Sequence, residues 1–219
     1  GSSILPGSTI PALAEKIRPA VEKAPIKKYF SLNGGEVIYF DNVFYASWAD
    51  EIFQGLLAEI SWQQQYIKIY GRQRKLPRLT AWVADPQVEY KYSGIVTLRQ
   101  EWTKRLLIAK QKVENTLGTT FNGALLNRYR DGEDSVSWHA DNEPALGKHP
   151  MVASLSFGAA RIFQMKHRKL KNEKLTIELQ HGSLLVMTGS TQENWLHQVP
   201  KTRRELGERI NVTFRRINS

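Results

Sequence analysis

The sequence predicts a mainly β protein, a sandwich or barrel with flanking helices. In the second half of the chain, short segments rich in β-branched and aromatic residues alternate with turns rich in Gly, Asp, Asn or Lys. Two segments in the first half instead repeat apolar residues at helical spacing. About seven short strands at near-regular intervals are typical of a sandwich or barrel.

The expected strands begin with Glu36–Phe40, which alternates apolar and polar residues. Residues 63–93 are rich in strand formers and turn signals. The later strands are expected at Phe121–Tyr129, Met151–Phe157, Arg161–His167, Leu175–Leu179, Ser183–Thr188 and Arg209–Ile217.

Two helices are expected to pack against this β-structure. Ser47 and Asp50 have the spacing of a capping box, and apolar residues recur at helical spacing from Ala49 to Ile60. A second amphipathic segment starts near Trp102, and Gly118 is well placed to end it. We assign these helices a packing role and no chemistry.

The length of 219 residues suits a single domain, which we expect at 25–219. Residues 1–24 contain three prolines among small and charged residues and open with Gly1-Ser2-Ser3, so we expect a flexible arm that includes residues of an expression tag. There is no run of 18 apolar residues and no charged-then-apolar leader, so neither a membrane span nor a secretory signal is expected. The chain has no cysteine, which excludes disulfides and thiolate metal sites and fits an intracellular protein of the cytoplasm or nucleus.

The formal net charge of +10 bears on binding partners. Lysines and arginines that neutralise phosphates release counterions, so a basic surface favours nucleic acid in a salt-dependent way. A soluble basic protein without such a partner is an equally good explanation of charge alone.

Candidate metal ligands lie at the end of the segment 127–141. In extended backbone His139 and Asp141 face the same way, as do Asn127 and Tyr129. A second imidazole would complete the two-histidine, one-carboxylate face that is typical of non-haem Fe(II) sites. The residues alone do not rank the candidates for it, which are His149, His167, His181 and His197. A lone strand histidine is more often structural.

The last expected strand carries a polar face. Arg209, Asn211, Thr213 and Arg215 alternate with apolar residues, so guanidinium groups lie where an anion could dock. The two arginines are six residues apart, or about 20 Å at about 3.3 Å per residue. They therefore cannot both bind one carboxylate of a small dicarboxylate unless their side chains converge. The alternative is a pair of surface charges on an edge strand.

These spaced elements resemble the AlkB family of Fe(II)- and 2-oxoglutarate-dependent nucleic-acid dealkylases. The matching residues are Asn127-x-Tyr129, Gly132, His139-x-Asp141, His197 and Arg209-x-Asn211-x3-Arg215, in this order. The similarity extends from about Val37 to Ile217. It implies a double-stranded β-helix, or jelly roll, with the metal at its open mouth and helices supporting one sheet.

The resemblance also implies the roles of the metal residues. It selects His197 as the second imidazole, so His139, Asp141 and His197 form the metal-binding and catalytic set for Fe(II). The co-substrates would be 2-oxoglutarate and O2. The implied reaction oxidises 2-oxoglutarate to succinate and CO2, hydroxylates an N-methyl group of a damaged base and releases formaldehyde.

We expect 2-oxoglutarate to use the polar face of the last strand. Arg209 would pair with its distal carboxylate, aided by Tyr129. Asn127 and Asn211 would be hydrogen-bond partners, and Arg215 would serve the metal end.

A duplex-preferring enzyme needs a device to extrude a base from the stack. Ile69-Tyr70-Gly71 opens a turn and resembles the hairpin with which such family members wedge a hydrophobic finger into DNA. The cations that follow it are Arg72, Arg74, Lys75 and Arg78. The alternative is an ordinary hairpin with an exposed tyrosine.

Four residues are expected to bind the extruded base. Tyr90 and Tyr92 lie in a segment that resembles the base-binding strand of the family; Tyr92 would stack on the base and Tyr90 would hydrogen-bond it. Asn142 and Glu143 would contact the amino edge of a methylated adenine or cytosine, although some relatives carry an acid at the first position. Core packing of the two tyrosines is the alternative.

Two further basic clusters are expected to contact the nucleic-acid backbone: residues 166–171, and Lys201 with Arg203 and Arg204. The sequence therefore predicts an oxidative demethylase for lesions of the 1-methyladenine and 3-methylcytosine type in duplex or single-stranded DNA, acting as a monomer. The alternatives are the same chemistry on RNA, a nucleic-acid-binding protein with a vestigial metal site, and a protein hydroxylase of the same fold.

Overall fold

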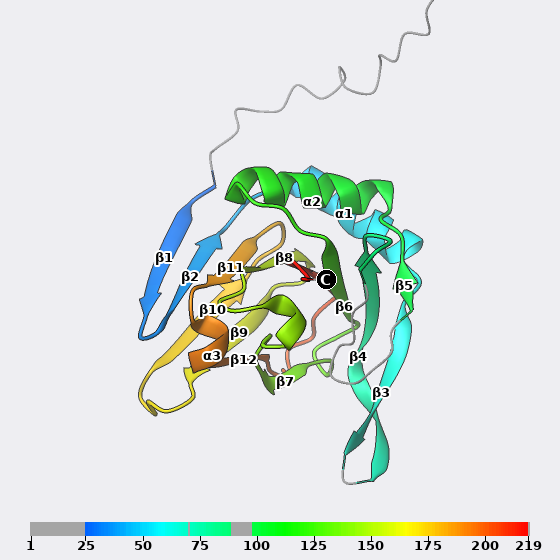
Figure 1. The fold of residues 1–219 in the computed structure, drawn as a ribbon. Helices are drawn as coiled ribbons and strands as arrows, with labels where there is room; N and C mark the ends of the chain where they lie inside the picture. Colours follow the sequence, from blue (N-terminus) through cyan, green and yellow to red (C-terminus); the bar gives the residue numbers. More distant parts are fainter. Residues whose placement is uncertain (1–24, 70, 89–97, 219) are drawn as a thin grey trace, which may run out of the picture.

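The structure, a computed structural model, describes residues 25–69, 71–88 and 98–218. Within these residues the strands form two sheets that face each other (Figure 1). The nine-stranded sheet contains, in order, β1 (Lys27–Leu32), β2 (Gly35–Phe40), β11 (Leu184–Thr188), β8 (Val152–Gly158), β13 (Arg209–Arg215), β6 (Gly123–Tyr129), β4 (Arg72–Ala84) and β3 (Gln63–Ile69), with β5 (Arg99–Gln100) beside β4. The four-stranded sheet contains β10 (Lys174–Leu179), β9 (Arg161–His167), β12 (Trp195–Val199) and β7 (Val136–His139).

Neighbouring strands in both sheets come from distant parts of the sequence. In the larger sheet β11 lies between β2 and β8, and β13 lies between β8 and β6, with all of these pairs antiparallel. Two facing antiparallel sheets with such crossed connections form a jelly roll, or double-stranded β-helix. The predicted fold class is therefore confirmed.

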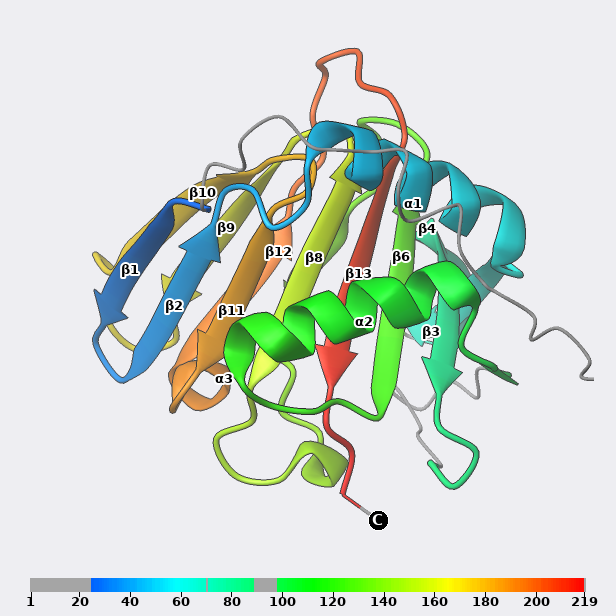
Figure 2. The same ribbon diagram turned by 90° about the horizontal axis from the view of Figure 1, so that it is seen from above.

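Two long helices, α1 (Ala46–Glu59) and α2 (Lys104–Leu117), cover the outer face of the larger sheet (Figure 2). Their apolar faces and the sheet enclose one hydrophobic cluster, which includes Leu56, Leu106 and Phe214. A second cluster, which includes Tyr129 and Met165, fills the space between the two sheets. The short helices are η1 (Pro144–Leu146) and α3 (Thr191–Asn194).

The helix ends agree only in part with the sequence. Gly118 ends α2 with a left-handed φ of 65°, as predicted. The predicted capping box at Ser47 and Asp50 is wrong, because α1 begins at Ala46 after a Tyr45 cap that makes no side-chain hydrogen bond. Asp50 is instead free to reach His181, with its carboxylate oxygen 3.2 Å from the imidazole Nε2.

The predicted arm, residues 1–24, lies outside the described residues. Among the helices that the structure describes, none is both long enough and apolar enough to cross a membrane.

Candidate active site

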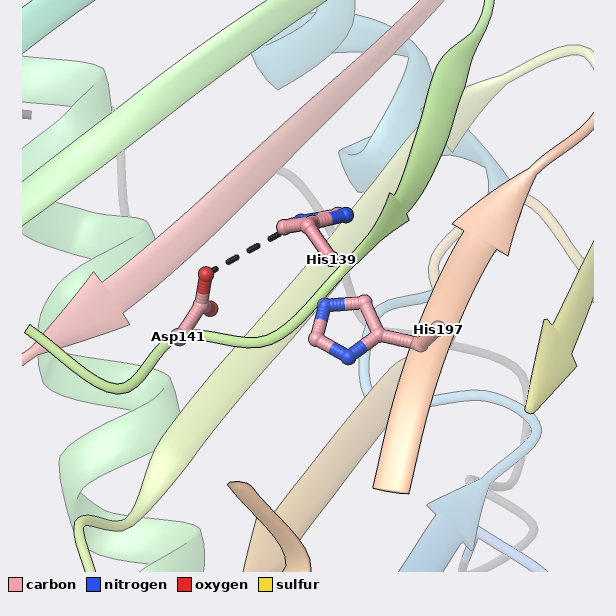
Figure 3. A group of neighbouring side chains, drawn as sticks. All are labelled: His139, Asp141 and His197. Atoms are coloured by element: carbon pink, nitrogen blue, oxygen red, sulfur yellow. Dashed lines mark ion pairs between the residues drawn. The ribbon is translucent and has the colours of Figure 1, made fainter. Parts of the chain in front are cut away.

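The two histidines of the candidate metal centre lie on adjacent strands. β7 and β12 pair antiparallel with His139 directly opposite His197, and the two ring centroids are 4.2 Å apart. Asp141 follows the end of β7 and turns back toward both rings (Figure 3). One ligand atom from each residue lies within 4.8 Å of the others. The fold therefore brings together the three residues that the family resemblance selected.

The backbone fixes which nitrogen of His139 faces Asp141. Nδ1 is 2.8 Å from the carbonyl oxygen of Ser137. Since a carbonyl only accepts, Nδ1 is the donor in this bond, and Nε2 is the ring nitrogen that faces the carboxylate. Nε2 lies 3.9 Å from Asp141 Oδ1, the contact drawn as a dashed line in Figure 3.

Asp141 is buried and held from two sides. Its Oδ2 accepts a hydrogen bond from Arg215 Nη2 at 2.9 Å, and its backbone nitrogen donates to Gln192 Oε1 at 2.9 Å. Burial on its own raises the pKa of the Asp141 carboxyl, but the Arg215 guanidinium and then the His197 and His139 imidazoles oppose this and lower the pKa to about 2. The group is therefore a carboxylate at neutral pH. Its buried Oδ1 has no hydrogen-bond partner among the described residues.

His197 is a buried imidazole that packs on an aromatic ring. Its centroid lies 5.4 Å from that of Phe163, with the rings nearly parallel. Burial lowers the pKa of His197 to about 3, with a further contribution from His139 and against the opposing charge of Asp141. A neutral imidazole is the form that binds a metal.

The donor set fits Fe(II). Two neutral imidazoles and one carboxylate on a single face are the ligands typical of non-haem iron oxygenases, with positions left open for small molecules. One ligand atom from each of the three residues already lies within 4.8 Å of the others, and the unpartnered Asp141 Oδ1 is an oxygen that such an ion would satisfy.

A buried guanidinium lies in the same pocket. Arg209 on β13 is directly opposite Tyr129 on β6, is 1% exposed, and has its Cζ 5.0 Å from the tyrosine ring centroid. Its Nη2 donates to Ser156 Oγ at 3.0 Å. Its Nε and Nη1 have no hydrogen-bond partner within the part of the chain that the structure describes. Burial lowers the pKa of Arg209, with Tyr129 opposing. A buried cation with open donors fits an anionic co-substrate such as a dicarboxylate.

Two asparagines expected to bind the co-substrate are engaged by the protein. Asn127 lines the pocket, but its Oδ1 accepts from Arg78 Nε at 2.7 Å. Asn211 donates through Nδ2 to Ser154 Oγ at 2.7 Å, and its Oδ1 accepts from the Thr213 hydroxyl at 2.9 Å. Both side chains therefore shape the wall of the pocket.

Arg78 was expected to contact nucleic acid, but in the structure it is buried. It is 5% exposed, and besides Asn127 its guanidinium bonds the carbonyl of Ser135 at 3.2 Å. The side chain points inward because position 78 lies in the part of β4 where alternate residues are buried. It belongs to the pocket wall, which corrects the surface assignment.

Another buried arginine connects the segments that carry the histidines. Arg161 donates to the carbonyls of Asp131 at 3.0 Å and Asp134 at 2.8 Å, which precede β7, and to that of Pro200 at 2.7 Å, which follows β12. Gly132 in the first loop lies so close to the second that a Cβ there would approach Thr202 O to 2.5 Å. The two loops are therefore fixed to each other.

The expected base-binding residues are described in part. Tyr90 and Tyr92 lie outside the described residues, as does Tyr70 of the proposed wedge. Asn142 is exposed beside the metal cluster. Glu143 Oε2 is buried and lacks a hydrogen-bond partner among the described residues, so it is an acceptor placed two positions after Asp141.

The expected cationic residues are mostly at the surface. The β3–β4 hairpin projects from the barrel (Figure 1) and exposes Arg72, Arg74 and Lys75, while Ile69 ends β3. Gly71 takes a left-handed φ of 77° in the turn, which a larger residue would adopt with strain. Arg203 is exposed, whereas Lys201 Nζ pairs with Glu133 Oε2 at 3.2 Å.

The other histidines are used elsewhere. His181 Nδ1 accepts from Gly158 N at 2.8 Å, and His167 Nδ1 accepts from Lys169 N at 3.0 Å. His149 lies 3.1 Å from the hydroxyl of Ser190. The structure thus distinguishes His197 from the three alternatives that the residues alone left open.

Sequence reasoning missed four residues of the site. Phe163 packs on His197, Ser156 bonds Arg209, Gln192 holds the backbone of Asp141, and Arg161 joins the two loops. Arg161 could have been noticed in the sequence, because it is a charged residue at the start of an apolar strand. The other three are ordinary residues whose contacts arise only from the tertiary fold.

A jelly roll that gathers two imidazoles, a carboxylate and a buried arginine in one pocket has the fold and site of an iron- and 2-oxoglutarate-dependent oxygenase. Residues 36–215 match the model of the 2OG-Fe(II) oxygenase superfamily. The chain is 40% identical to the alpha-ketoglutarate-dependent dioxygenase alkB homolog 3 of Bos taurus over 77% of this chain and 62% of that protein. It is 35% identical to the DNA oxidative demethylase ALKBH2 of Arabidopsis thaliana, over 91% of this chain and 72% of that protein.

Solved structures agree on the fold. The structure of OsALKBH1 superposes with a TM-score of 0.56 at 17% identity, covering 86% of this chain and 100% of that one. A prolyl hydroxylase from Trichoplax adhaerens, in complex with a hypoxia inducible factor peptide fragment, gives 0.58 at 12% identity, covering 85% and 84%. The family model and the identity to ALKBH2 show that the chain belongs to the AlkB family within the 2OG-Fe(II) oxygenase superfamily.

Proposed function

We propose that this protein is an Fe(II)- and 2-oxoglutarate-dependent dioxygenase that demethylates N-alkylated bases in DNA, with lesions of the 1-methyladenine and 3-methylcytosine type as substrates. The observation that most supports this is one pocket lined both by the His139, Asp141 and His197 cluster and by the buried Arg209. An oxygenase of this kind needs both a metal face and an anchor for the dicarboxylate.

In this proposal His139 Nε2, Asp141 Oδ1 and His197 hold the Fe(II). Arg215 keeps the second oxygen of Asp141 occupied, so that a single carboxylate oxygen faces the ion. The low pKa values of Asp141, about 2, and His197, about 3, keep one group ionised and the other neutral at physiological pH, which avoids the proton release that metal binding otherwise requires.

Arg209 would anchor the distal carboxylate of 2-oxoglutarate through an open N–H group of its guanidinium, while Ser156 and Tyr129 fix the guanidinium. When bound, Fe(II) with 2-oxoglutarate and O2 supplies the oxidation of the N-methyl group, whose hydroxylated product releases formaldehyde. Phe163, Leu179 and Met187 line the pocket and would limit the access of water.

Three observations support DNA as the substrate. One matched relative carries the name DNA oxidative demethylase. The net charge of +10 and the exposed cations Arg72, Arg74, Lys75 and Arg203 suit a phosphate backbone. The buried, unpartnered Oε2 of Glu143 suits the amino group that adenine and cytosine share. We further propose that the protein acts as a single domain and a monomer, and action on DNA implies that it works inside the cell.

The direct test measures formaldehyde and succinate after incubation with Fe(II), 2-oxoglutarate and oligonucleotides that carry 1-methyladenine or 3-methylcytosine. His139→Ala and Asp141→Ala should abolish both products while the metal-free protein stays folded, although Asp141→Ala should lower the melting temperature because it removes a buried partner of Arg215. Asp50→Ala, which removes an exposed aspartate of α1, is the matched control and should retain activity. Full turnover by either cluster variant with metal still bound would contradict the proposed ligands.

The same assay separates the alternatives. Duplex DNA, single-stranded DNA and RNA of one sequence are compared at equal lesion concentration. If RNA is turned over faster than both duplex and single-stranded DNA, the substrate is RNA and not DNA. Normal DNA binding without Fe(II)-dependent turnover would identify a binding protein with a vestigial site.

A further inference from the structure

The side-chain amide of Gln192 makes two hydrogen bonds in opposite directions. Its Oε1 accepts from the backbone nitrogen of Asp141 at 2.9 Å, and its Nε2 donates to the sulfur of Met187 at 3.5 Å. Gln192 is 1% exposed and Met187 is 2% exposed, so both side chains are almost completely shielded from solvent. A buried chain of contacts therefore leads from the carboxylate residue of the metal cluster to a thioether.

The two bonds determine which way the amide of Gln192 points. An amide has one accepting end and one donating end. The backbone nitrogen of Asp141 donates, so Oε1 must face Asp141, and Nε2 then faces Met187. If the amide turned over, two donors would meet at Asp141. A thioether is a weak acceptor, but this one favours the orientation that Asp141 requires.

The sulfur of Met187 is attached to a well-supported strand. β11 lies between β2 and β8 in the larger sheet, and Met187 is directly opposite Val37 on one side and Val152 on the other. Both valines belong to the same buried apolar cluster as Met187, between the two sheets. The strand and the cluster together give Gln192 a fixed atom against which to align.

Met187 also lines the pocket that contains the metal cluster and Arg209. One side chain thus forms part of the wall of the pocket and part of the support for Asp141. A substitution at this position acts on both, so a test of the second role has to separate it from a change in the pocket wall.

We propose that Met187 is a positioning residue of the metal centre: its sulfur fixes the orientation of the Gln192 amide and, through Gln192, the peptide that carries Asp141. This inference rests on the proposed function, because it concerns the site that would hold Fe(II). In this role Met187 acts through Gln192 and takes no part in the reaction.

Met165 provides a matched control. It is 1% exposed and belongs to the same apolar cluster as Met187. It is directly opposite His197 on the neighbouring strand, so it also lies beside a residue of the metal cluster. Gln192, however, bonds Met187 and not Met165. Met165→Leu therefore reports the effect of a similar change in packing without the loss of the acceptor.

The first test uses the metal-free protein and the backbone amide of Asp141. Leucine has nearly the volume of methionine but no acceptor, so Met187→Leu leaves the buried Nε2 of Gln192 without this partner and loosens the amide. We expect the amide hydrogen of Asp141 to exchange with solvent roughly 2–10-fold faster, the range for the net loss of one hydrogen bond. Hydrogen exchange followed by NMR measures this. Met165→Leu should exchange at the parent rate, and an unchanged rate in Met187→Leu would overturn the proposal.

The second test measures the affinity for Mn(II) by electron paramagnetic resonance. Contacts that orient metal ligands are worth about 10–100-fold in affinity. Met187→Leu weakens such a contact without removing it, so we expect a smaller loss, of about 3–10-fold. Met165→Leu should bind Mn(II) like the parent. Equal affinities of the two leucine variants would contradict the role of Met187.

A double-mutant cycle separates this role from the place of Met187 in the pocket wall. If Met187 acts through Gln192, Met187→Leu should cause no further loss of Mn(II) affinity in a protein that already carries Gln192→Met. If Met187 acts only by packing, the two losses should add. Additive losses would therefore refute the proposal.

Neither measurement requires turnover, which separates this inference from the proposed function. A parent protein that binds Mn(II) but releases no formaldehyde from methylated DNA would refute the proposed function, and the exchange of the Asp141 amide would still decide the role of Met187. Normal turnover by the parent, together with equal exchange rates in the parent and Met187→Leu, would refute only the inference.

Discussion

The amide oxygen of Gln192 accepts a hydrogen bond from the backbone nitrogen of Asp141 at 2.9 Å. Gln192 is 1% exposed and lies on α3, and the preceding residue, Thr191, donates to the carbonyl of Glu36 at 3.1 Å. The peptide that carries the carboxylate of the metal cluster is thus tied, through α3, to β2 of the larger sheet.

Replacement of Gln192 by Met should weaken metal binding. The change keeps the volume but removes the acceptor, so the Asp141 peptide loses its fixed position, and such outer contacts are worth about 10–100-fold in metal affinity. Anaerobic titration with Fe(II), or with Mn(II) followed by electron paramagnetic resonance, measures this. Gln192→Glu retains an acceptor and should bind metal better than Gln192→Met. Gln198→Met is the control, because the Gln198 side chain bonds Gln164 and not the Asp141 peptide. If Gln198→Met loses as much metal affinity as Gln192→Met, Gln192 has no special role.

Replacement of Arg209 by Lys should weaken the binding of 2-oxoglutarate. Lysine keeps the charge, but its donors all lie on one nitrogen and cannot reproduce the planar guanidinium that bonds Ser156 through one nitrogen and presents donors on two others. Loss of one charge-assisted hydrogen bond, worth about 1.5–3 kcal/mol, corresponds to about 10–150-fold in affinity. Isothermal titration with 2-oxoglutarate in the presence of Mn(II) measures binding without turnover. Arg203→Lys, at an exposed position, should leave this affinity unchanged, and an unchanged affinity of Arg209→Lys would remove Arg209 as the anchor.

Replacement of Glu143 by Gln should lower kcat/KM for methylated bases. The carboxylate Oε2 is buried without a partner among the described residues, and a base amino group would supply one. A neutral amide is a weaker acceptor, so we expect a loss of about tenfold. Steady-state kinetics on 1-methyladenine and 3-methylcytosine measure it, with the slow consumption of 2-oxoglutarate in the absence of DNA as an internal reference. If that reference falls by the same factor, Glu143 acts on the metal pocket and not on the base.

Replacement of Asp134 by Asn should reduce stability at neutral pH and not in acid. Asp134 accepts from Arg130 Nε at 2.7 Å and Nη2 at 2.8 Å. Burial raises the pKa of Asp134, but the bonds from Arg130 outweigh this and lower it below the ordinary value of 3.8. A carboxyl with a depressed folded pKa stabilises the protein above its unfolded pKa, and this is lost as the pH falls through the folded value.

The melting temperature of metal-free Asp134→Asn should therefore lie below that of the metal-free parent at pH 7. The two melting temperatures should converge below pH 3.8. Each kcal/mol corresponds to about 2–4 °C for a protein of this size. Glu133→Gln, in the same loop but with an exposed carboxylate, provides the comparison. If the difference in melting temperature between the parent and Asp134→Asn is just as large in acid, the effect of the substitution is due to packing and not to charge.

The arrangement of β6 and β13 was largely predictable from the sequence. Strict alternation from Arg209 to Arg215 defines two faces, and the strand pairs with β6 so that Arg209 meets Tyr129 and Asn211 meets Asn127. Period-two patterns determine which residues share a face. They do not reveal that Asn211 is engaged by Ser154, because that contact depends on the neighbouring strand β8.

The two histidine strands were harder to predict. β7 has four residues and β12 has five, too short for alternation to stand out, although both carry metal-cluster residues. The family resemblance located His197 where periodicity could not. Arg78 shows a different limit of sequence reasoning. Arg72, Arg74 and Lys75 precede it on β4 and are exposed, whereas Arg78 is buried because it lies further along β4, inside the sheet.

The guanidinium of Arg161, bonded to carbonyls on both sides of the histidine strands, has a mechanical consequence. These bonds couple the loop that exposes Arg203 to the turn that leads into His139, so that a displacement of one is transmitted to the other. A nucleic-acid strand bound at Arg203 would therefore shift both imidazoles of the candidate metal cluster together.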